Sequence, residues 1–169
     1  MITGSVAAAY HGAPRATADI DFVIAPTLPQ VSTIVAAFLD AGLYASESAA
    51  LEAHRLSSMF NVVDANSGWK VDLILRKDRP FSREEFSRRI MTEWDGVSVG
   101  VATLEDVILS KLEWAHLGES RRQLEDAKTL LRVRQRDADA AYLAHWVEAL
   151  GLGAEWKIVT RELTSYSVG

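Results

Sequence analysis

Apolar and polar residues alternate along residues 19–25, and this pattern predicts a strand. Every second residue from Ile20 falls on its apolar face, while Asp19 and Asp21 fall together on the opposite face. The small residues 5–11 lie just before this strand and predict a helix. Residues 1–4 are predicted to be the tail of a short strand, so the chain is expected to begin with this strand, a helix and a second strand whose polar face carries two neighbouring carboxylates.

Two later pairs of segments are rich in β-branched and aromatic residues and are joined by short polar turns, which predicts two antiparallel hairpins. Apolar residues at helical spacing, with capping residues before them, predict helices between and after the hairpins. The predicted hairpin strands are 59–63 with 69–75 and 90–94 with 97–102. The predicted helices are one over 31–39, a short one opened by a capping box of Ser82 and Glu85, and 104–117, 121–134, 138–150 and 154–164.

These elements describe a mixed α and β chain in which the sheet comes first. The predicted fold class is α/β (α+β), with a mixed or antiparallel sheet flanked by helices and a helical carboxy-terminal half. A length of 169 residues is close to that of one domain. We therefore expect a single domain over residues 1–169, with a sheet-containing half (1–102) and a helical half (103–169).

Composition places the chain among globular proteins and removes several kinds of site. Apolar residues make up 49% of the sequence and charged residues 24%. The absence of cysteine excludes disulfides and thiolate metal sites, and the four histidines show no ligand spacing. A net charge of −5 disfavours a general nucleic-acid-coating protein. Prolines interrupt the uncharged residues 22–39 and no secretion signal is recognisable, so we expect no membrane span and a cytoplasmic location.

The polar face of the first strand is the leading candidate site. Asp19 and Asp21 lie two residues apart, so their carboxylates are neighbours and repel each other. Mg²⁺ is a hard cation that takes oxygen ligands, and it relieves such repulsion. Asp72 falls on the polar face of its own predicted strand and joins the pair if the two strands are neighbours. The alternative is a solvated strand face that binds no ligand.

Other polar residues are candidates for binding phosphate. Gly4 and Ser5 form a strand-to-helix turn, which either binds phosphate through backbone N–H groups or only starts a helix. Arg15 and Thr17 either bind anionic oxygens or make hydrogen bonds within their loop. Lys111 lies on the apolar stripe of its predicted helix, where it either binds phosphate or extends to solvent.

The residues GSVAAAYHGAPRATADIDFVI at 4–24, followed by KVDLIL at 70–75, resemble the DNA polymerase β-like nucleotidyltransferase superfamily. The shared pattern is a Gly-Ser turn, a helix, an Asp-x-Asp strand and a later acidic strand. The form PRATADIDFV, with TLEDVILSKLEWA and RRQLEDAKTLL downstream, is similar to the AbiEii/AbiGii-type nucleotidyltransferases. These include toxins of toxin–antitoxin systems. The resemblance covers about residues 1–133.

This resemblance implies the transfer of a nucleoside monophosphate from an NTP to a hydroxyl group of an acceptor, with release of pyrophosphate. It implies that Asp19, Asp21 and Asp72 are catalytic and bind Mg²⁺ or Mn²⁺, with Asp72 also a candidate base. Cofactor and substrate are thus a divalent metal ion and an NTP.

The resemblance also assigns the phosphate-binding candidates. It implies that Gly4 and Ser5 hold the nucleotide phosphates and that Lys111 contacts the triphosphate. Asp126 matches an acidic position of the family with a less defined role behind the site. Without the resemblance, the spacing favours an ion pair between Asp126 and Arg122, which lies one helical turn earlier.

A basic cluster suggests the acceptor. Six basic and three acidic residues between positions 76 and 89 give a local charge of +3 in an acidic chain. We expect this cluster to dock the 3′ end of an RNA, as in relatives that modify tRNA. The alternative is a solvated helix whose arginines pair with Glu84 and Glu85. The basic cluster consists of Arg76, Lys77, Arg79, Arg83, Arg88 and Arg89.

Two other functions stay open at this point. One is a non-catalytic regulatory or antitoxin-like module that binds a nucleotide. The other is a nucleotidyltransferase that modifies a small, aminoglycoside-like molecule rather than RNA, for which an acidic pocket is the better partner. If the chain is a toxin, a cognate antitoxin is its expected protein partner.

Overall fold

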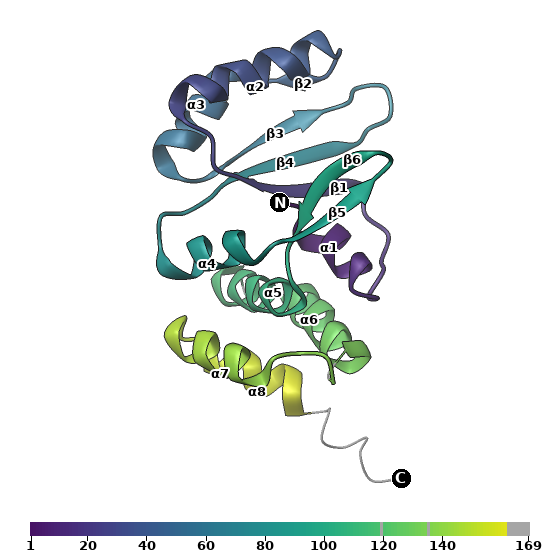
Figure 1. Ribbon diagram of the computed structural model, residues 1–169, viewed down its shortest axis with the longest axis vertical. Coiled ribbons are helices and arrows are strands. Elements are labelled where there is room, and N and C mark those ends of the chain that lie inside the picture. Colours follow the sequence, from purple (N-terminus) through teal and green to yellow (C-terminus); the bar gives the residue numbers. More distant parts are fainter. Residues whose placement is uncertain (119, 135, 162–169) are drawn as a thin grey trace. The chain divides into compact units, whose positions relative to one another are not determined.

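The computed structural model describes residues 1–118, 120–134 and 136–161 of the chain (Figure 1). The chain divides into two compact units. The first contains Met1–Val6 and Ala16–Ala102, and the second contains Ala7–Arg15 and the chain from Thr103 onward. A single domain over the whole chain stays a prediction.

The first unit is built on a four-stranded mixed sheet with the strand order β1-β4-β3-β2. β1 and β4 run parallel, whereas β3 pairs antiparallel with both β4 and β2. The parallel pair is possible because a long connection with two helices separates β1 from β4 along the chain. The strands are β1 (Asp19–Ile24), β2 (Tyr44–Ala45), β3 (Met59–Val63) and β4 (Lys70–Leu75).

Residues 1–3 link this sheet to a second hairpin. Ile2 bridges antiparallel to Phe22 on one side and parallel to Val101 on the other. The N–H of Ile2 donates to the carbonyl of Gly100 at 2.7 Å, and the N–H of Thr3 donates to that of Asp21 at 2.9 Å. The first residues of the chain are thereby fixed beside β1. The hairpin strands are β5 (Ile90–Trp94) and β6 (Val97–Val101).

Helices α2 and α3 cover one face of the four-stranded sheet (Figure 1). Their small apolar side chains pack against alternate residues of β1, β3 and β4, which places the main core of the unit on this face. The opposite face of the same strands is left for polar side chains. The helices are α2 (Leu28–Asp40) and α3 (Glu47–Leu56). The buried core residues are Val31, Val35, Ala45, Ala50, Ala53, Phe60, Val62, Leu73 and Leu75.

Helix α4 (Pro80–Arg88) begins two residues before the predicted capping box, which is therefore wrong. Arg79 is the N-cap and Pro80 occupies the first helical turn, where the missing N–H of proline costs nothing. Ser82 and Glu85 lie buried inside the helix instead of at its start. The proline thus determined the start of the helix more strongly than the Ser-Glu spacing.

The second unit contains most of helix α1 (Gly4–Tyr10) and four later helices. In its interior, Asp106 accepts hydrogen bonds from the hydroxyls of Thr103 at 2.6 Å and Tyr142 at 2.7 Å, which ties α5 to α7. Leu112 and Leu130 are among its fully buried side chains. The later helices are α5 (Leu104–Gly118), α6 (Arg121–Arg134), α7 (Ala140–Ala149) and α8 (Gly153–Arg161).

The structure confirms the mixed α and β class with a helical second half, and both predicted hairpins. The sequence predicted no element between residues 43 and 58, where β2 and α3 lie. The end of the last predicted helix, 162–164, lies outside the described residues. In the part of the chain that is described, no helix combines the length and the apolar character needed to cross a membrane.

Candidate active site

Three aspartates share the sheet face that α2 and α3 leave open. In the parallel pairing of β1 with β4, Asp21 lies directly opposite Asp72, and Asp19 lies opposite Lys70. Residues that are opposite in register point to the same face, and neighbouring strands lie about 4.8 Å apart. The two acidic strands are therefore neighbours, as the sequence argument required. We call Asp19, Asp21 and Asp72 the acidic face.

Lys70 brings a positive charge into the acidic face. Its Nζ lies 3.2 Å from Oδ2 of Asp72 and 3.8 Å from Oδ1 of Asp19. The hydrogen bond to Asp72, supported by the negative charges of Asp72, Asp19 and Asp21, raises the pKa of Lys70 above its usual 10.5. Lys70 is therefore fully charged at neutral pH, and one cation opposes three carboxylates.

Asp72 is held in place from both sides. Its side chain is 10% exposed, whereas the side chain of Asp19 is 53% exposed. Asn61 lies opposite Asp72 in the antiparallel pairing of β3 with β4, and its Nδ2 donates to Oδ1 of Asp72. Because Lys70 contacts Oδ2, both carboxylate oxygens have a partner. The orientation of this carboxylate is thus set by the sheet around it.

Gly4 brings the backbone of the Gly-Ser turn directly against Asp21. Its φ of +61° lies in the left-handed region, and a Cβ at this position would be 2.0 Å from Oδ2 of Asp21. Only glycine avoids both the strained backbone and the overlap. The Gly-Ser turn and the Asp-x-Asp strand, which the sequence pattern separates by a helix and a loop, therefore meet at one place.

The residue types of the acidic face suit a divalent cation, since Mg²⁺ and Mn²⁺ take carboxylate oxygens. Among the described residues, however, no three His, Asp or Glu side chains are gathered closely enough to hold a metal ion. Asp19 and Asp72 instead share the ammonium of Lys70. The donor set thus offers the oxygen ligands that the cation takes, on neighbouring strands, but in this arrangement Lys70 contacts two of the three carboxylates.

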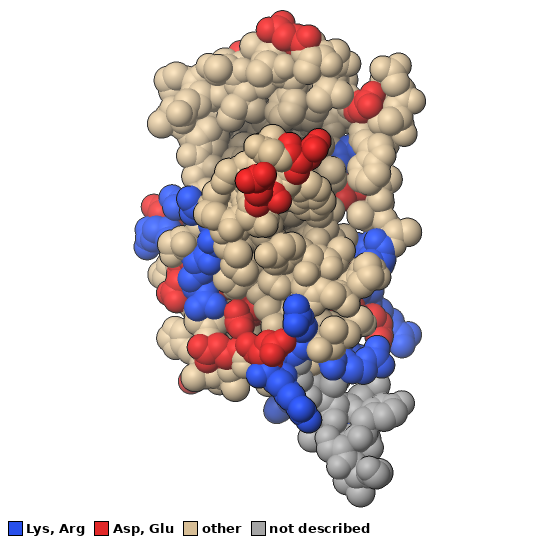
Figure 2. Space-filling model, turned by 45° about the vertical axis from the view of Figure 1, so that its right-hand side comes forward, with Lys and Arg blue, Asp and Glu red and all other residues tan. Residues whose placement is uncertain are grey.

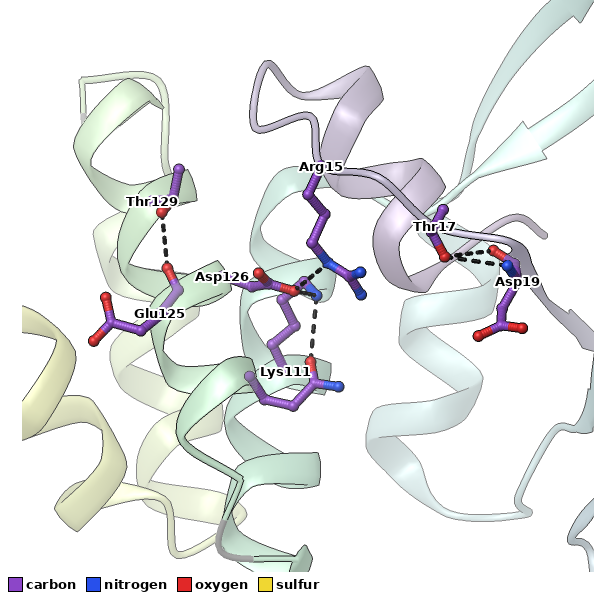
Figure 3. Close-up of polar contacts among 8 residues, drawn as sticks. Arg15, Thr17, Asp19, Lys111, Glu125, Asp126 and Thr129 are labelled. Carbon is purple, nitrogen blue, oxygen red and sulfur yellow. Dashed lines mark hydrogen bonds and ion pairs between the residues drawn. The ribbon is translucent and has the colours of Figure 1, made fainter.

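Two of the phosphate candidates make contacts inside the fold. Ser5 is buried and has a partner within the structure. The hydroxyl of Thr17 donates to the carbonyl of Asp19 at 3.2 Å and accepts from its N–H at 3.1 Å (Figure 3). Thr17 thus makes the loop hydrogen bonds that the sequence offered as the alternative to phosphate binding.

A separate ion-pair cluster lies in the second unit (Figure 3). Lys111 is 3% exposed, and its Nζ lies 2.7 Å from Oδ2 of Asp126 and 3.3 Å from Oε1 of Gln123. Nε of Arg15 contacts the same Oδ2 at 3.0 Å. Extension of Lys111 to solvent is therefore wrong, because a carboxylate holds the ammonium inside. The expected pairing of Asp126 with Arg122 is replaced by pairing with Lys111 and Arg15.

The basic cluster is partly engaged by its own surroundings. Nη1 of Arg83 lies 2.7 Å from Oδ1 of Asp78, and Nε of Arg79 donates to the hydroxyl of Ser82 at 2.9 Å. The guanidinium of Arg89 lies 4.6 Å from the ring centre of Phe86. Figure 2 shows basic side chains next to acidic ones rather than an uninterrupted basic surface on the visible face. The cluster thus offers fewer unengaged donors than its count of arginines suggests.

Sequence reasoning gave no role to two residues that contact the acidic face, Lys70 and Asn61. Lys70 lies two positions before Asp72 on the same strand, so the alternation that placed Asp72 also placed Lys70 beside it. Asn61 is harder to find, because its position opposite Asp72 depends on the hairpin register. A search for cations on the same strand face as the aspartates finds the first but not the second.

The comparisons with known proteins give a structural likeness. No family model matches the sequence, and no curated protein matches it. Among solved structures, the solution structure of the antibiotic-resistance factor ANT(2'')-Ia is similar, at 14% sequence identity and a TM-score of 0.49. The likeness covers 98% of this chain and 85% of that one. A similarity of this size carries no statement about activity or ligands, so function has to be argued from the acidic face itself.

Proposed function

We propose that the chain is a metal-dependent nucleotidyltransferase that transfers a nucleoside monophosphate from an NTP to a hydroxyl group of an acceptor. The acceptor oxygen forms a bond to the α-phosphorus, the bond from that phosphorus to the β-bridging oxygen breaks, and pyrophosphate leaves. Asp19, Asp21 and Asp72 are the proposed metal ligands. The observation that carries this proposal is the register of β1 and β4, which sets Asp21 opposite Asp72.

The alternative of a merely solvated strand face explains these observations less well. A solvated carboxylate has no need of the burial of Asp72, nor of the two side chains that fix its oxygens. Nor does solvation require a backbone approach to Asp21 that only Gly4 permits. Like charges collected at a partly buried face lower stability and are typical of sites that bind or react.

A bound divalent cation supplies charge neutralisation on the transferring phosphate and makes the attacking hydroxyl more acidic. Asp19 and Asp21 are proposed to hold that cation from β1. Asp72 is proposed to complete the ligand set through Oδ2, because Asn61 already bonds Oδ1, and its carboxylate is the candidate base for the proton of the attacking hydroxyl. Positioning of the two reactants accounts for most of the rate gain in this chemistry.

The phosphates of the NTP are proposed to contact the backbone of Gly4 and Ser5. Support comes from Gly4, where no Cβ stands between the backbone and Asp21. Without a metal ion, phosphate oxygens placed here would be repelled by the carboxylate of Asp21. A neighbouring metal ion is therefore part of the same proposal.

The triphosphate is further proposed to be bound by Lys111, with Arg15 and Thr17 as additional contacts. Lys111 and Arg15 both bond Asp126, so this role requires them to exchange a carboxylate oxygen for phosphate oxygens. The carboxylate of Asp126 and the phosphate oxygens are both anionic and both accept charge-assisted hydrogen bonds, which makes the exchange chemically feasible. Asp126 is proposed to keep these cations charged and oriented before the nucleotide binds.

We propose a small hydroxylated molecule as the acceptor. The net charge of −5 and the internal contacts of Arg79, Arg83 and Arg89 support it over a long polyanion. A cationic, aminoglycoside-like acceptor would in addition be attracted to exposed carboxylates such as that of Asp19. The 3′ end of an RNA is the competing acceptor, and the experiment below separates the two.

A competing function is a regulatory or antitoxin-like module that binds a nucleotide without turnover. The described contacts of the acidic face are compatible with binding alone, so turnover is the deciding observation. Such a module would protect against unfolding when an NTP is added and would release no pyrophosphate.

The proposal is tested by incubating the protein with each α-labelled NTP, Mg²⁺ or Mn²⁺, and either total RNA or a panel of hydroxylated small molecules. We expect pyrophosphate release and label on a small molecule. Label on RNA alone would contradict the acceptor assignment and leave the reaction standing. Thermal protection by an NTP without pyrophosphate release in any mixture would favour the non-catalytic module.

A further inference from the structure

Lys70 is the cation that the acidic face already holds. Its Nζ contacts Oδ2 of Asp72 at 3.2 Å and Oδ1 of Asp19 at 3.8 Å. These are oxygens of two of the three carboxylates to which the proposed function assigns the metal ion. Lys70 stands opposite Asp19 in the β1–β4 register, so its presence at the face follows from the sheet and not from a loop.

We propose that Lys70 is an internal counter-ion of the acidic face, and that a divalent cation must displace it from Asp72 before it can bind. This inference rests on the proposed function, because it concerns the same metal site. It assigns to Lys70 a role in setting metal affinity, separate from any part in the transfer reaction.

Competition follows from the contacts themselves. A metal ion and the ammonium seek the same Oδ2 of Asp72, and the two cations repel each other at such short separation. While Lys70 is bound, it lowers the repulsion among the three carboxylates. A metal ion can therefore bind the carboxylates only if it displaces the ammonium of Lys70, which compensates part of their negative charge.

The side chain of Lys70 is free to make this exchange. It is 37% exposed and has a flexible four-carbon stem, so its ammonium reaches water by rotation about side-chain bonds. Lys111 offers the contrast, since its side chain is only 3% exposed. Displacement of Lys70 therefore needs no change in the backbone of β1 or β4.

The test measures Mn²⁺ binding to nucleotide-free protein by electron paramagnetic resonance, which counts free Mn²⁺ without any turnover. Lys70→Met removes the charge and keeps most of the stem, and we expect it to bind Mn²⁺ on the order of tenfold more tightly than wild type. Lys70→Arg keeps the charge and should bind close to wild type. Lys77→Met, an exposed lysine of the same unit, is the matched control and should also be unchanged.

Asp72→Asn serves to locate the ion, because loss of binding in this variant identifies the acidic face as the Mn²⁺ site.

A second measurement is thermal unfolding in EDTA. There Lys70→Met should unfold at a lower temperature than wild type, because its carboxylates have lost their counter-ion, and added Mn²⁺ should restore it.

The outcomes separate the two proposals. Equal or weaker Mn²⁺ binding by Lys70→Met, with Asp72→Asn impaired, overturns the role of Lys70 and leaves the metal site intact. Mn²⁺ binding that Asp72→Asn does not weaken, or no binding by wild type and Lys70→Met alike, contradicts the metal site and thus the proposed function itself. If Lys70→Met and Lys77→Met each bind Mn²⁺ more tightly than wild type, the inference is also overturned, because the gain in affinity then comes from net charge alone.

Discussion

At the scale of single residues, the acidic face depends on the absence of a side chain at position 4. Gly4 has a φ of +61°, and the nearest atom to a Cβ placed there is Oδ2 of Asp21, at 2.0 Å. A substitution at Gly4 has two costs, which are backbone strain and overlap with a carboxylate. The two costs can be separated, because a substitution at Gly42 of the same unit would cause backbone strain without the overlap. Gly42 has a φ of +78° and nothing within 4 Å of its Cβ position.

Gly4→Ala should therefore lose more stability than Gly42→Ala. Both variants bear the cost of a left-handed alanine, roughly 1–2 kcal/mol. Only Gly4→Ala must also displace Asp21, so it should lose Mn²⁺ affinity as well. Urea unfolding gives the free energies, and paramagnetic resonance gives the affinity. Equal losses of stability in the two variants, with unchanged Mn²⁺ binding in Gly4→Ala, would contradict the contact between Gly4 and Asp21.

The cluster of Lys111, Asp126 and Arg15 predicts an unequal response to removing either partner. Asp126→Leu leaves a buried ammonium without its carboxylate and should cost about 3–5 kcal/mol. Lys111→Met leaves Asp126 bonded to Arg15 and should cost about 1–3 kcal/mol. The double variant should be more stable than Asp126→Leu alone. A double-mutant cycle by urea unfolding measures this, and strictly additive losses would show that the pair does not interact.

At the scale of elements, α5 and α7 are joined through a buried carboxylate. Asp106 is fully buried and accepts hydrogen bonds from Thr103 and Tyr142. Tyr142→Phe removes one donor and should lower the free energy of unfolding by about 1–3 kcal/mol. Tyr44→Phe is the control, since Tyr44 is 65% exposed. If Tyr142→Phe changes stability no more than Tyr44→Phe does, the bond between these helices contributes nothing.

The contacts of Lys70 on β4 also predict that the stability of the chain depends on pH. The pKa of Lys70 is raised above 10.5 in the folded chain, so its stabilising contacts are complete below that pH and are lost as pH rises through the folded pKa. In EDTA, the stability difference between wild type and Lys70→Met should stay constant from neutral pH to about pH 10 and shrink above it. Urea unfolding at several pH values checks this. A difference that already disappears near neutral pH would contradict the raised pKa.

The sequence patterns predicted those parts of the fold that depend on neighbours along the chain. The hairpins, the helices from Leu104 onward and the shared face of Asp19 and Asp21 follow from local alternation and spacing. The parallel register that sets Asp21 against Asp72 does not, because tertiary packing pairs strands that are distant in sequence. The partner of Lys111 was missed for the same reason. It lies on α6, and only the packing of α5 on α6 brings Asp126 to Lys111, so that Asp126 pairs with Lys111 and not with Arg122.

At the scale of the whole molecule, the charge balance bears on the acceptor. The chain carries a net charge of −5, and three acidic residues lie among the six basic residues between positions 76 and 89. Transfer to a small molecule should therefore fall only modestly with added salt, because a small acceptor makes few charge contacts. Transfer to an RNA bound through phosphates would instead fall steeply as salt increases. Initial rates measured over a range of NaCl concentrations distinguish the two acceptors, and a steep fall would contradict the proposed small molecule.

The most direct measurement of the central claim is nucleotidyl transfer by matched variants of one protein. Wild type, Asp21→Asn and Asp40→Asn, the last in an exposed aspartate at the end of α2, are compared for pyrophosphate release with the preferred NTP and metal ion. We predict that Asp21→Asn stays folded and loses activity on the order of a hundredfold or more, while Asp40→Asn equals wild type. Activity in Asp21→Asn equal to that of wild type would contradict the assignment of the acidic face as the active site.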